Sequence, residues 1–333
     1  MGVARNLSIL NCFEFPKLEH LEIQPQGPPF KPVPAFLLRS KSLLSISGLC
    51  VNPRDLSRIL TELPQLKKLD IEVDNDEASD IESEDSDEGV CRTRKNFEDA
   101  RCSLESLRIN LLPADGIPNM VAACPGLKEL RFTFDEFETN GHDCDFLPLR
   151  NLHLRLLELD YVELGDRDKS IREISAALSS TTDSPLSRSL EEFVGHFSFR
   201  HFSDLRLLRS FASCHSLRVL HMRPSNDGNP KSHNRVSVGS ILRSDNFPHL
   251  EELSLFCVKL DGFGKGDIFD LPFLEQLTIC PCEKHSDPVL AQFVAKVLEM
   301  WICPTKRGSD PPFTVSVLSD HQNVSIVILH NEK

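Results

Sequence analysis

The feature that most constrains the fold is a short phrase of apolar residues that recurs along the chain. Residues 63–71 read Leu-Pro-Gln-Leu-Lys-Lys-Leu-Asp-Ile, and the same spacing returns at 15–23, 124–132, 247–255 and 271–279. Its core is L-x-x-L-x-L, with other apolar residues in place of some leucines. Successive side chains of a strand point to opposite faces, so the final L-x-L predicts a short strand with one buried face.

The phrase also occurs in less regular copies. Its first residue falls at Leu18, Leu43, Leu66, Leu104, Leu127, Leu190, Leu217, Leu250 and Leu274. Two copies carry a glycine, Gly48 or Gly195, in the last apolar place. Between residues 149 and 159 the frame is ambiguous, because strands that end at Leu154 or at Leu159 both satisfy the pattern. Some neighbouring copies lie 23 to 27 residues apart and others 33 to 38, so the longer gaps carry insertions.

Between the copies the apolar spacing changes to about 3.6 residues, which predicts helices. The clearest case is 52–60, where Asn52 suits the N-cap and Pro53 the first helical position. Segments 168–179, 203–213 and 287–301 read in the same way, and 324–329 reads as a closing strand. Strands and helices that alternate through short links predict parallel strands with helices outside them.

This pattern is the signature of the leucine-rich repeat, whose period is about 20–29 residues. One such unit cannot bury its apolar face alone, whereas stacked copies share one continuous core. We therefore expect an α/β leucine-rich-repeat solenoid, or horseshoe, with parallel strands on the concave face and helices on the convex face. The expected organisation is a single domain over 1–333 of about ten to eleven irregular repeats.

The sequence begins within a copy of the repeated phrase, since Leu7-Ser8-Ile9 is already predicted to be a strand. Terminal repeats normally require a polar cap. We therefore expect either that a cap is missing or that the chain is a fragment of a longer product.

An acidic segment at 74–100 interrupts the repeats. Its first part, 74–88, holds nine acidic residues and no basic one. Such a block repels itself and cannot bury apolar area, which predicts a disordered insertion. Two hypotheses stay open: a tolerated solvated insertion, or a regulatory or partner-binding segment in which Ser79, Ser83 and Ser86 are phosphorylated.

Composition limits the classes of partner and compartment. The net charge of −13 argues against a nucleic-acid partner. No apolar run of about 18 residues and no signal-peptide core occur, so neither a membrane partner nor export is expected. An odd count of 11 cysteines then favours free thiols in a cytoplasmic or nuclear protein. Cys124 and Cys214 each lie three residues before the first Leu of a copy, where a small buried residue fits.

Motifs for chemistry are weak. The glycine-rich stretch at 262–266 lacks the spacing of a phosphate-binding loop. Cys280, Cys282 and His285 do not form a standard zinc-binding pattern, and packing explains Cys280 at a strand end. No nucleophile, base and orienting group converge in the sequence. We expect no catalytic residue, cofactor or metal site.

The remaining candidate site is the exposed face of the sheet. The residues that flank the middle apolar position of each copy should point away from the core. With strands about 4.8 Å apart, they form a ribbon on the order of 40–50 Å long, ample for a protein partner. The candidate protein-binding residues are His20, Glu22, Lys68, Asp70, Arg108, Glu129, Arg131, His221, Arg223, Glu252, Ser254 and Gln276. Loops on the strand-exit side, which include Phe256 and Arg223, are the rival surface.

The chain resembles the leucine-rich-repeat region of fungal F-box-type proteins. The resemblance is carried by Phe-Pro-x-Leu-Glu-x-Leu at 15–21 and 247–253, by Cys-Pro-Gly-Leu-Lys-Glu-Leu at 124–130, and by the acidic insertion. It implies substrate recognition for a cullin-type ubiquitin ligase. The F-box itself is not seen, so a cullin-linked adaptor is expected as a partner only if an F-box lies upstream.

The sequence thus leaves three hypotheses, in falling order. The first is a non-catalytic protein–protein interaction module that selects ligase substrates. The second is a stand-alone leucine-rich-repeat scaffold or regulator unconnected with ubiquitin. An enzyme is the third.

Overall fold

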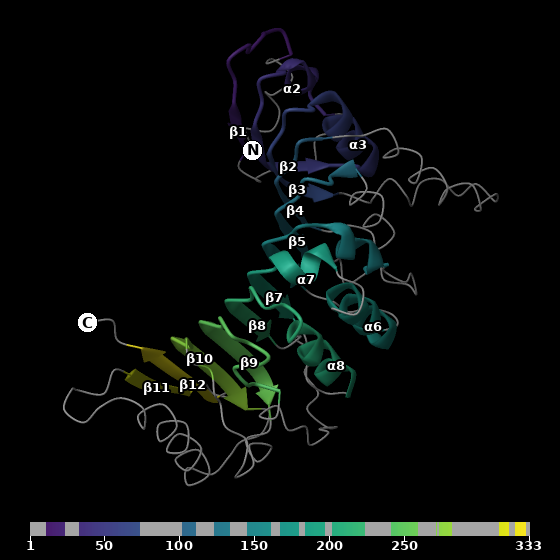
Figure 1. Cartoon of the computed structure of the whole chain (residues 1–333). Coiled ribbons are helices and arrows are strands. Elements are labelled where there is room, and N and C mark those ends of the chain that lie inside the picture. The colour runs from purple at the N-terminus through teal and green to yellow at the C-terminus, as the bar shows by residue number, and fades with distance from the viewer. Residues whose placement is uncertain are drawn as a thin grey trace, which may run out of the picture. The chain divides into compact units, whose positions relative to one another are not determined.

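The computed structural model describes residues 11–23, 33–73, 102–110, 123–133, 145–160, 167–179, 184–196, 202–223, 241–258, 271, 273–281, 313–319 and 324–330. The chain divides into two compact units, Met1–Ser170 (unit 1) and Ile171–Lys333 (unit 2), and each contains strands and helices (Figure 1). The expected opening strand at 7–9, the acidic insertion at 74–100 and the helix at 287–301 lie outside the described residues.

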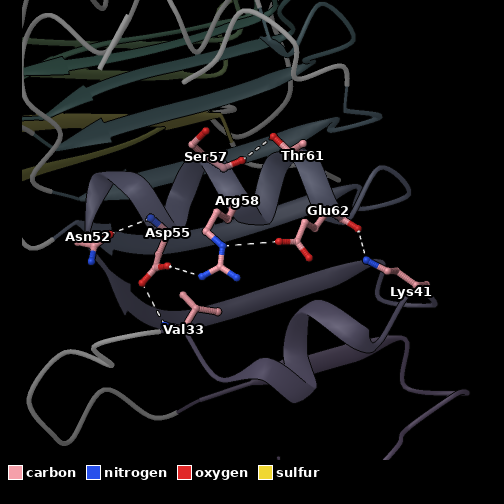
Figure 2. A network of polar contacts seen from close by, with 8 residues as sticks. All are labelled: Val33, Lys41, Asn52, Asp55, Ser57, Arg58, Thr61 and Glu62. Atoms are coloured by element: carbon pink, nitrogen blue, oxygen red, sulfur yellow. Dashed lines mark hydrogen bonds and ion pairs between the residues drawn. The ribbon is translucent and has the colours of Figure 1, made fainter. Parts of the chain in front are cut away.

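The described part of unit 1 contains six parallel strands that pair in chain order. They are β1 (His20–Glu22), β2 (Ser45–Val51), β3 (Lys68–Val73), β4 (Ser106–Asn110), β5 (Glu129–Thr133) and β6 (Leu156–Asp160). Its helices include α2 (Ala35–Arg39), α3 (Pro53–Glu62) and the 3-10 helix η3 (Leu147–Asn151). Helix α3 lies on one face of the strands and does not cover the other face (Figures 1 and 2).

The core of unit 1 comes from two rows of apolar side chains that run across the strands in register. The first row is Leu21, Ile46, Leu69, Leu107, Leu130 and Leu157. The second is Leu49, Ile71, Ile109, Phe132 and Leu159. All but the half-buried Leu21 are buried. Each described copy of the phrase in this unit therefore ends in a strand, as the sequence predicts.

The register also decides the ambiguous frame. Leu157 and Leu159 face the core from β6, and the backbone N–H of Leu156 donates to the carbonyl of Lys128 at 3.1 Å. Leu149 and Leu152 are buried too, but around η3, where the N–H of Leu152 donates to the carbonyl of Leu149 at 3.0 Å. The strand is therefore the one that ends at the second of the two candidate positions.

Gly48 occupies a bulge rather than the last apolar place of its copy. The pairing of β2 with β3 shifts by one residue between Ser47 and Leu49, and Leu49 takes the buried position opposite Ile71. The φ of Gly48 is +73°, a left-handed conformation that glycine adopts without steric cost. An extra residue with this conformation is a known form of β-bulge.

Helix α3 begins as the sequence predicts. The Asn52 side chain accepts a hydrogen bond from the N–H of Asp55 at 2.8 Å, and Pro53 is the first helical residue (Figure 2). Asp55 then joins the helix to the preceding segment. Its Oδ2 accepts from the N–H of Val33 at 3.0 Å, and its Oδ1 pairs with Nη1 of Arg58 at 3.3 Å. This carboxylate is buried and 22 residues from Val33, so it is a tertiary link.

Replacing Asp55 by Ala is expected to lower the free energy of unfolding by about 2–3 kcal/mol, because the buried N–H of Val33 loses its acceptor. Glu62→Ala is the matched control, since Glu62 lies on the same helix and its ion pair with Arg58, at 3.6 Å, is exposed. The control should change stability by no more than about 0.5 kcal/mol. Urea unfolding of both variants measures the difference, and equal losses would contradict the tertiary role of Asp55.

Among its described residues, unit 2 has four parallel strands, β7 (Glu192–His196), β8 (Val219–Arg223), β9 (Glu252–Val258) and β10 (Gln276–Pro281). Helices α7 (Pro185–Ser189) and α8 (Phe202–Phe211) precede β7 and β8, and α6 (Arg167–Leu178) begins in the last residues of unit 1. The rings of Phe193 on β7 and Phe211 on α8 lie 4.4 Å apart between centroids, so helix α8 packs on the apolar face of β7. Helices α6 and α8 confirm the segments predicted at 168–179 and 203–213.

The C-terminal strands differ from the expectation in two respects. The predicted strand at 324–329 is present as β12 (Val324–His330), but it runs antiparallel to β10. It is the last strand in the chain but not the outermost one, because β11 (Phe313–Ser319) pairs along its other edge. A connection too short for a crossover helix permits only antiparallel pairing, which accounts for the β11–β12 hairpin.

The protein therefore belongs to the α/β class, with parallel strands and with helices between several of them. None of the helices in the described ranges is long and apolar enough to cross a membrane.

Candidate functional site

The outward face of unit 1 carries a row of charged side chains that cross the strands in register. This middle row consists of Glu22, Ser47, Asp70, Arg108, Arg131 and Glu158. On β3 to β6 each member lies between two buried apolar residues of its strand, so the alternation of these strands holds the row in place. Five of the six residues are charged.

The two arginines of the middle row are in different electrostatic situations. Arg131 on β5 pairs with Glu158 on β6, with 3.2 Å between Nε and Oε2, and both side chains are about one-third exposed. Arg108 is exposed on β4 between Asp70 and Arg131 in the register. Among the described residues, neither Asp70 nor Arg108 has an ion-pair partner. Like charges opposite each other in a sheet are destabilising, so Arg108 stands beside Arg131 at an energetic cost.

A second outward row lies two residues earlier on the strands. Its members are His20, Ser45, Lys68, Ser106, Glu129 and Leu156. The hydroxyl of Ser106 hydrogen-bonds to Oε2 of Glu129 at 3.0 Å. His20 and Lys68 are exposed. Lys68 on β3 is therefore an accessible cation in addition to Arg108, which lies on the neighbouring strand β4.

Charged residues also border this face just before the strands begin. Nζ of Lys128 donates to Oε2 of Glu105 at 2.6 Å, and Nζ of Lys67 lies 3.7 Å from Oε1 of the same carboxylate. The hydrogen bond from Lys128, and then its charge, hold the pKa of Glu105 below its ordinary value. These exposed pairs lie in water, where they contribute little to stability.

The outward face of unit 2 has fewer charges on its strands. One row is Glu192, Val219, Glu252 and Gln276, and the next is Val194, His221, Ser254 and Thr278. Nε2 of His221 lies 3.4 Å from Oε2 of Glu252. Ser254 is only 6% exposed, because the register places its short side chain between the larger His221 and Thr278. Ser254 therefore offers little surface to a partner.

An arginine–carboxylate pair with two hydrogen bonds borders this face. Nε and Nη2 of Arg218 donate to the two carboxylate oxygens of Glu251 at 2.8 and 2.6 Å. These hydrogen bonds lower the pKa of Glu251 and raise the pKa of Arg218 from their ordinary values. Two parallel bonds of this kind fix the geometry of both side chains.

The twelve candidate residues all lie on strands. Seven come together on the outward face of unit 1, namely His20, Glu22, Lys68, Asp70, Arg108, Glu129 and Arg131. Unit 2 carries the other five, His221, Arg223, Glu252, Ser254 and Gln276, with Arg223 opposite His196 in the register. The expectation of one ribbon along the whole chain stays a prediction.

Sequence reasoning missed two members of the middle row. Glu158 was hidden by the ambiguous frame at 149–159, and Ser47 by the glycine that follows it. Spacing could not reveal Glu158, because a copy that begins at Leu149 and one that begins at Leu154 both lie within the usual repeat period from the copy at Leu127. A glycine after an outward-facing residue was the available signal for Ser47, because glycine within a strand often marks a bulge.

Most of the motifs with possible chemistry lie outside the part of the chain that the structure describes. The stretch at 262–266, Cys282 and His285 lie outside the described residues, and Cys280 ends strand β10. In the ranges that the structure describes, no group of three or more His, Cys, Asp or Glu could hold a metal ion.

Comparison of the sequence with models of known protein families finds no match, and comparison with curated proteins finds no significant similarity.

Proposed function

We propose that this chain is a leucine-rich-repeat solenoid of the horseshoe type whose outward strand face binds a protein. The fold part of the proposal is supported by the recurrence of the L-x-x-L-x-L phrase and by the parallel pairing of one copy with the next within each unit. Stacked units of this kind present their strands as an extended binding surface.

The binding part of the proposal rests on one observation: the exposed Arg108 lies beside Arg131 and has no ion-pair partner among the described residues. Arginine is enriched at the energetic centres of protein interfaces. Its guanidinium binds carboxylates through two parallel hydrogen bonds. The partner group that this site favours is therefore an Asp or Glu side chain, which would also relieve the repulsion between the two arginines.

The resemblance to fungal F-box-type proteins supports a narrower form of the proposal, in which the bound protein is a substrate for a cullin-type ubiquitin ligase. The alternative is a scaffold or regulator unconnected with ubiquitin. Capture of the endogenous full-length protein separates them, because a ligase component would bring a cullin-linked adaptor with it and a scaffold would not.

Replacing Arg108 by Glu is expected to weaken partner binding at least about tenfold, or roughly 1.4 kcal/mol, because an attractive contact becomes a repulsive one. The melting temperature should hardly change, since Arg108 is exposed on the surface of its strand. The measurement is quantitative mass spectrometry of proteins that the full chain retains from an extract of its source cells, followed by titration of the purified partner.

Arg172→Glu provides the matched control. Arg172 is also exposed but lies on helix α6, away from the strands, so the same charge change should leave partner retention unaltered. A double variant, Lys68→Glu with Arg108→Glu, removes two exposed cations of this face. The outward face of unit 1 is not the binding surface if this variant, Arg108→Glu and Arg172→Glu all retain the same partners as the wild type.

A further inference from the structure

Two buried thiols meet at the start of strands β4 and β5. Cys102 precedes the copy that begins at Leu104, and Cys124 precedes the copy at Leu127. Their Sγ atoms lie 3.0 Å apart, and the two residues are 7% and 0% exposed. The backbone holds the pair together as well, because the N–H of Cys102 donates to the carbonyl of Ala123 at 3.3 Å. Buried cysteines commonly act as small apolar residues, but packing alone does not require two sulfur atoms in contact.

We infer that Cys102 and Cys124 are a modification site, which hydrogen peroxide or a small-molecule disulfide converts to an intramolecular disulfide. A disulfide bond is about 2.05 Å long, so the sulfur atoms need to approach by about 1 Å. The two cysteines are 22 residues apart in the chain, and the bond would join the segments that lead into two adjacent paired strands. These strands carry Arg108 and Arg131.

The two thiols are suited to different steps of this reaction. The hydrogen bond from Cys124 lowers the pKa of Cys102 to about 7, so a fraction of Cys102 is thiolate at neutral pH. The same hydrogen bond and burial raise the pKa of Cys124, which keeps its proton. The thiolate is the nucleophile in thiol oxidation, and Cys102 is the more exposed of the two.

With hydrogen peroxide, the Cys102 thiolate attacks one oxygen, the O–O bond breaks, and Cys102 becomes a sulfenic acid while hydroxide leaves. The Cys124 sulfur then attacks the sulfenic sulfur, and the S–O bond breaks as water leaves. The two thiols lose two electrons and two protons in total, and one peroxide becomes two waters. With oxidised glutathione, Cys102 forms a mixed disulfide that Cys124 resolves, and two reduced glutathiones leave.

Cys214 provides an internal comparison. It is buried three residues before Leu217, as Cys124 is before Leu127, but no other thiol contacts it among the described residues. Burial raises its pKa to about 12, so it is neither activated nor paired. Cys214 should therefore stay reduced under conditions that oxidise the pair.

Trypsin makes the test direct. Cleavage after Arg101, Arg108 and Lys128 places the two cysteines on separate peptides, 102–108 and 109–128, with one cysteine each. The reduced full chain is treated with hydrogen peroxide or, separately, with oxidised glutathione. Free thiols are then alkylated in denaturant, and the protein is digested without reductant. We expect a linked peptide pair two hydrogen atoms lighter than the sum of the two peptides, which reductant separates, while Cys214 is recovered alkylated.

Variants check the order of steps. In Cys124→Ser, oxidised glutathione should leave at least about tenfold more glutathione on Cys102 than in the wild type, because a serine hydroxyl can still donate a hydrogen bond to Cys102 but cannot resolve the mixed disulfide. Cys214→Ala should form the 102–124 link as the wild type does. The inference fails if both cysteines of the wild type are recovered alkylated while the exposed Cys12 is oxidised. It also fails if Cys102 is joined to another cysteine, or if wild type and Cys124→Ser retain glutathione equally.

Discussion

Replacing Leu69 by Asp is expected to unfold unit 1. Leu69 is fully buried on β3, between Ile46 and Leu107 in the first apolar row. Truncating a buried Leu already costs about 2–5 kcal/mol, and a carboxylate at this position adds the penalty of a charge without a partner. The total approaches the whole free energy of unfolding of a typical domain, about 5–15 kcal/mol. Circular dichroism during urea and thermal unfolding measures the loss.

Lys68→Asp is the control for this experiment. Lys68 precedes Leu69 on the same strand but is exposed on the outward face. Introducing the same residue there should change stability by no more than about 0.5–1 kcal/mol. A melting curve for Leu69→Asp like that of the wild type would show that the strand is not in the described register.

Replacing Gly48 by Ala is expected to cost roughly 3 kcal/mol or more, which is a large effect for a single methyl group. A Cβ atom at Gly48 would lie 1.8 Å from the carbonyl oxygen of Ile23, and the φ of +73° is itself unfavourable for alanine. The clash is with backbone, so a side-chain rotation cannot relieve it. The N–H of Ile23 donates to the carbonyl of Ser47 at 2.9 Å, and moving the bulge would disturb this link between β1 and β2.

Gly126→Ala is the matched control for the bulge. A Cβ at Gly126 would lie 3.7 Å from the carbonyl oxygen of Leu104, an ordinary contact, and its φ lies outside the left-handed range. This substitution should leave stability within about 1 kcal/mol of the wild type. Thermal unfolding of the two alanine variants compares them directly. Equal melting temperatures would mean that the close approach at Gly48 does not exist in solution.

Much of the fold follows from the amino-acid sequence because its signals are local. The L-x-L alternation places Leu69 and Ile71 on one face of a strand whatever the partner strand is. The start of α3 is equally local, since Asn52 caps the N–H of a residue three positions away. The outward direction of Lys68 and Asp70 follows from the same alternation. The class of fold and seven residues of the unit 1 face could therefore be predicted.

Other features depend on contacts between residues that are far apart in the chain, which spacing does not encode. The frame at 149–159 was decided by hydrogen bonds from β6 to Lys128, and this brought Glu158 to Arg131. The bulge at Gly48 depends on the backbone of Ile23, which approaches too closely for any side chain. The order of the last two strands depends on antiparallel pairing that neither strand specifies alone.

The contact between Cys102 and Cys124 belongs to the same class. Each cysteine taken alone lies just before a copy of the phrase, where a small buried residue is expected, so its presence needs no further explanation. Only the pairing of β4 with β5 brings the two sulfur atoms together. Where the phrase is regular, as on β3, the sequence by itself determined which residues are buried and which face outward, because alternation acts within one strand. The tertiary structure decided which of them meet, because register depends on hydrogen bonds between strands.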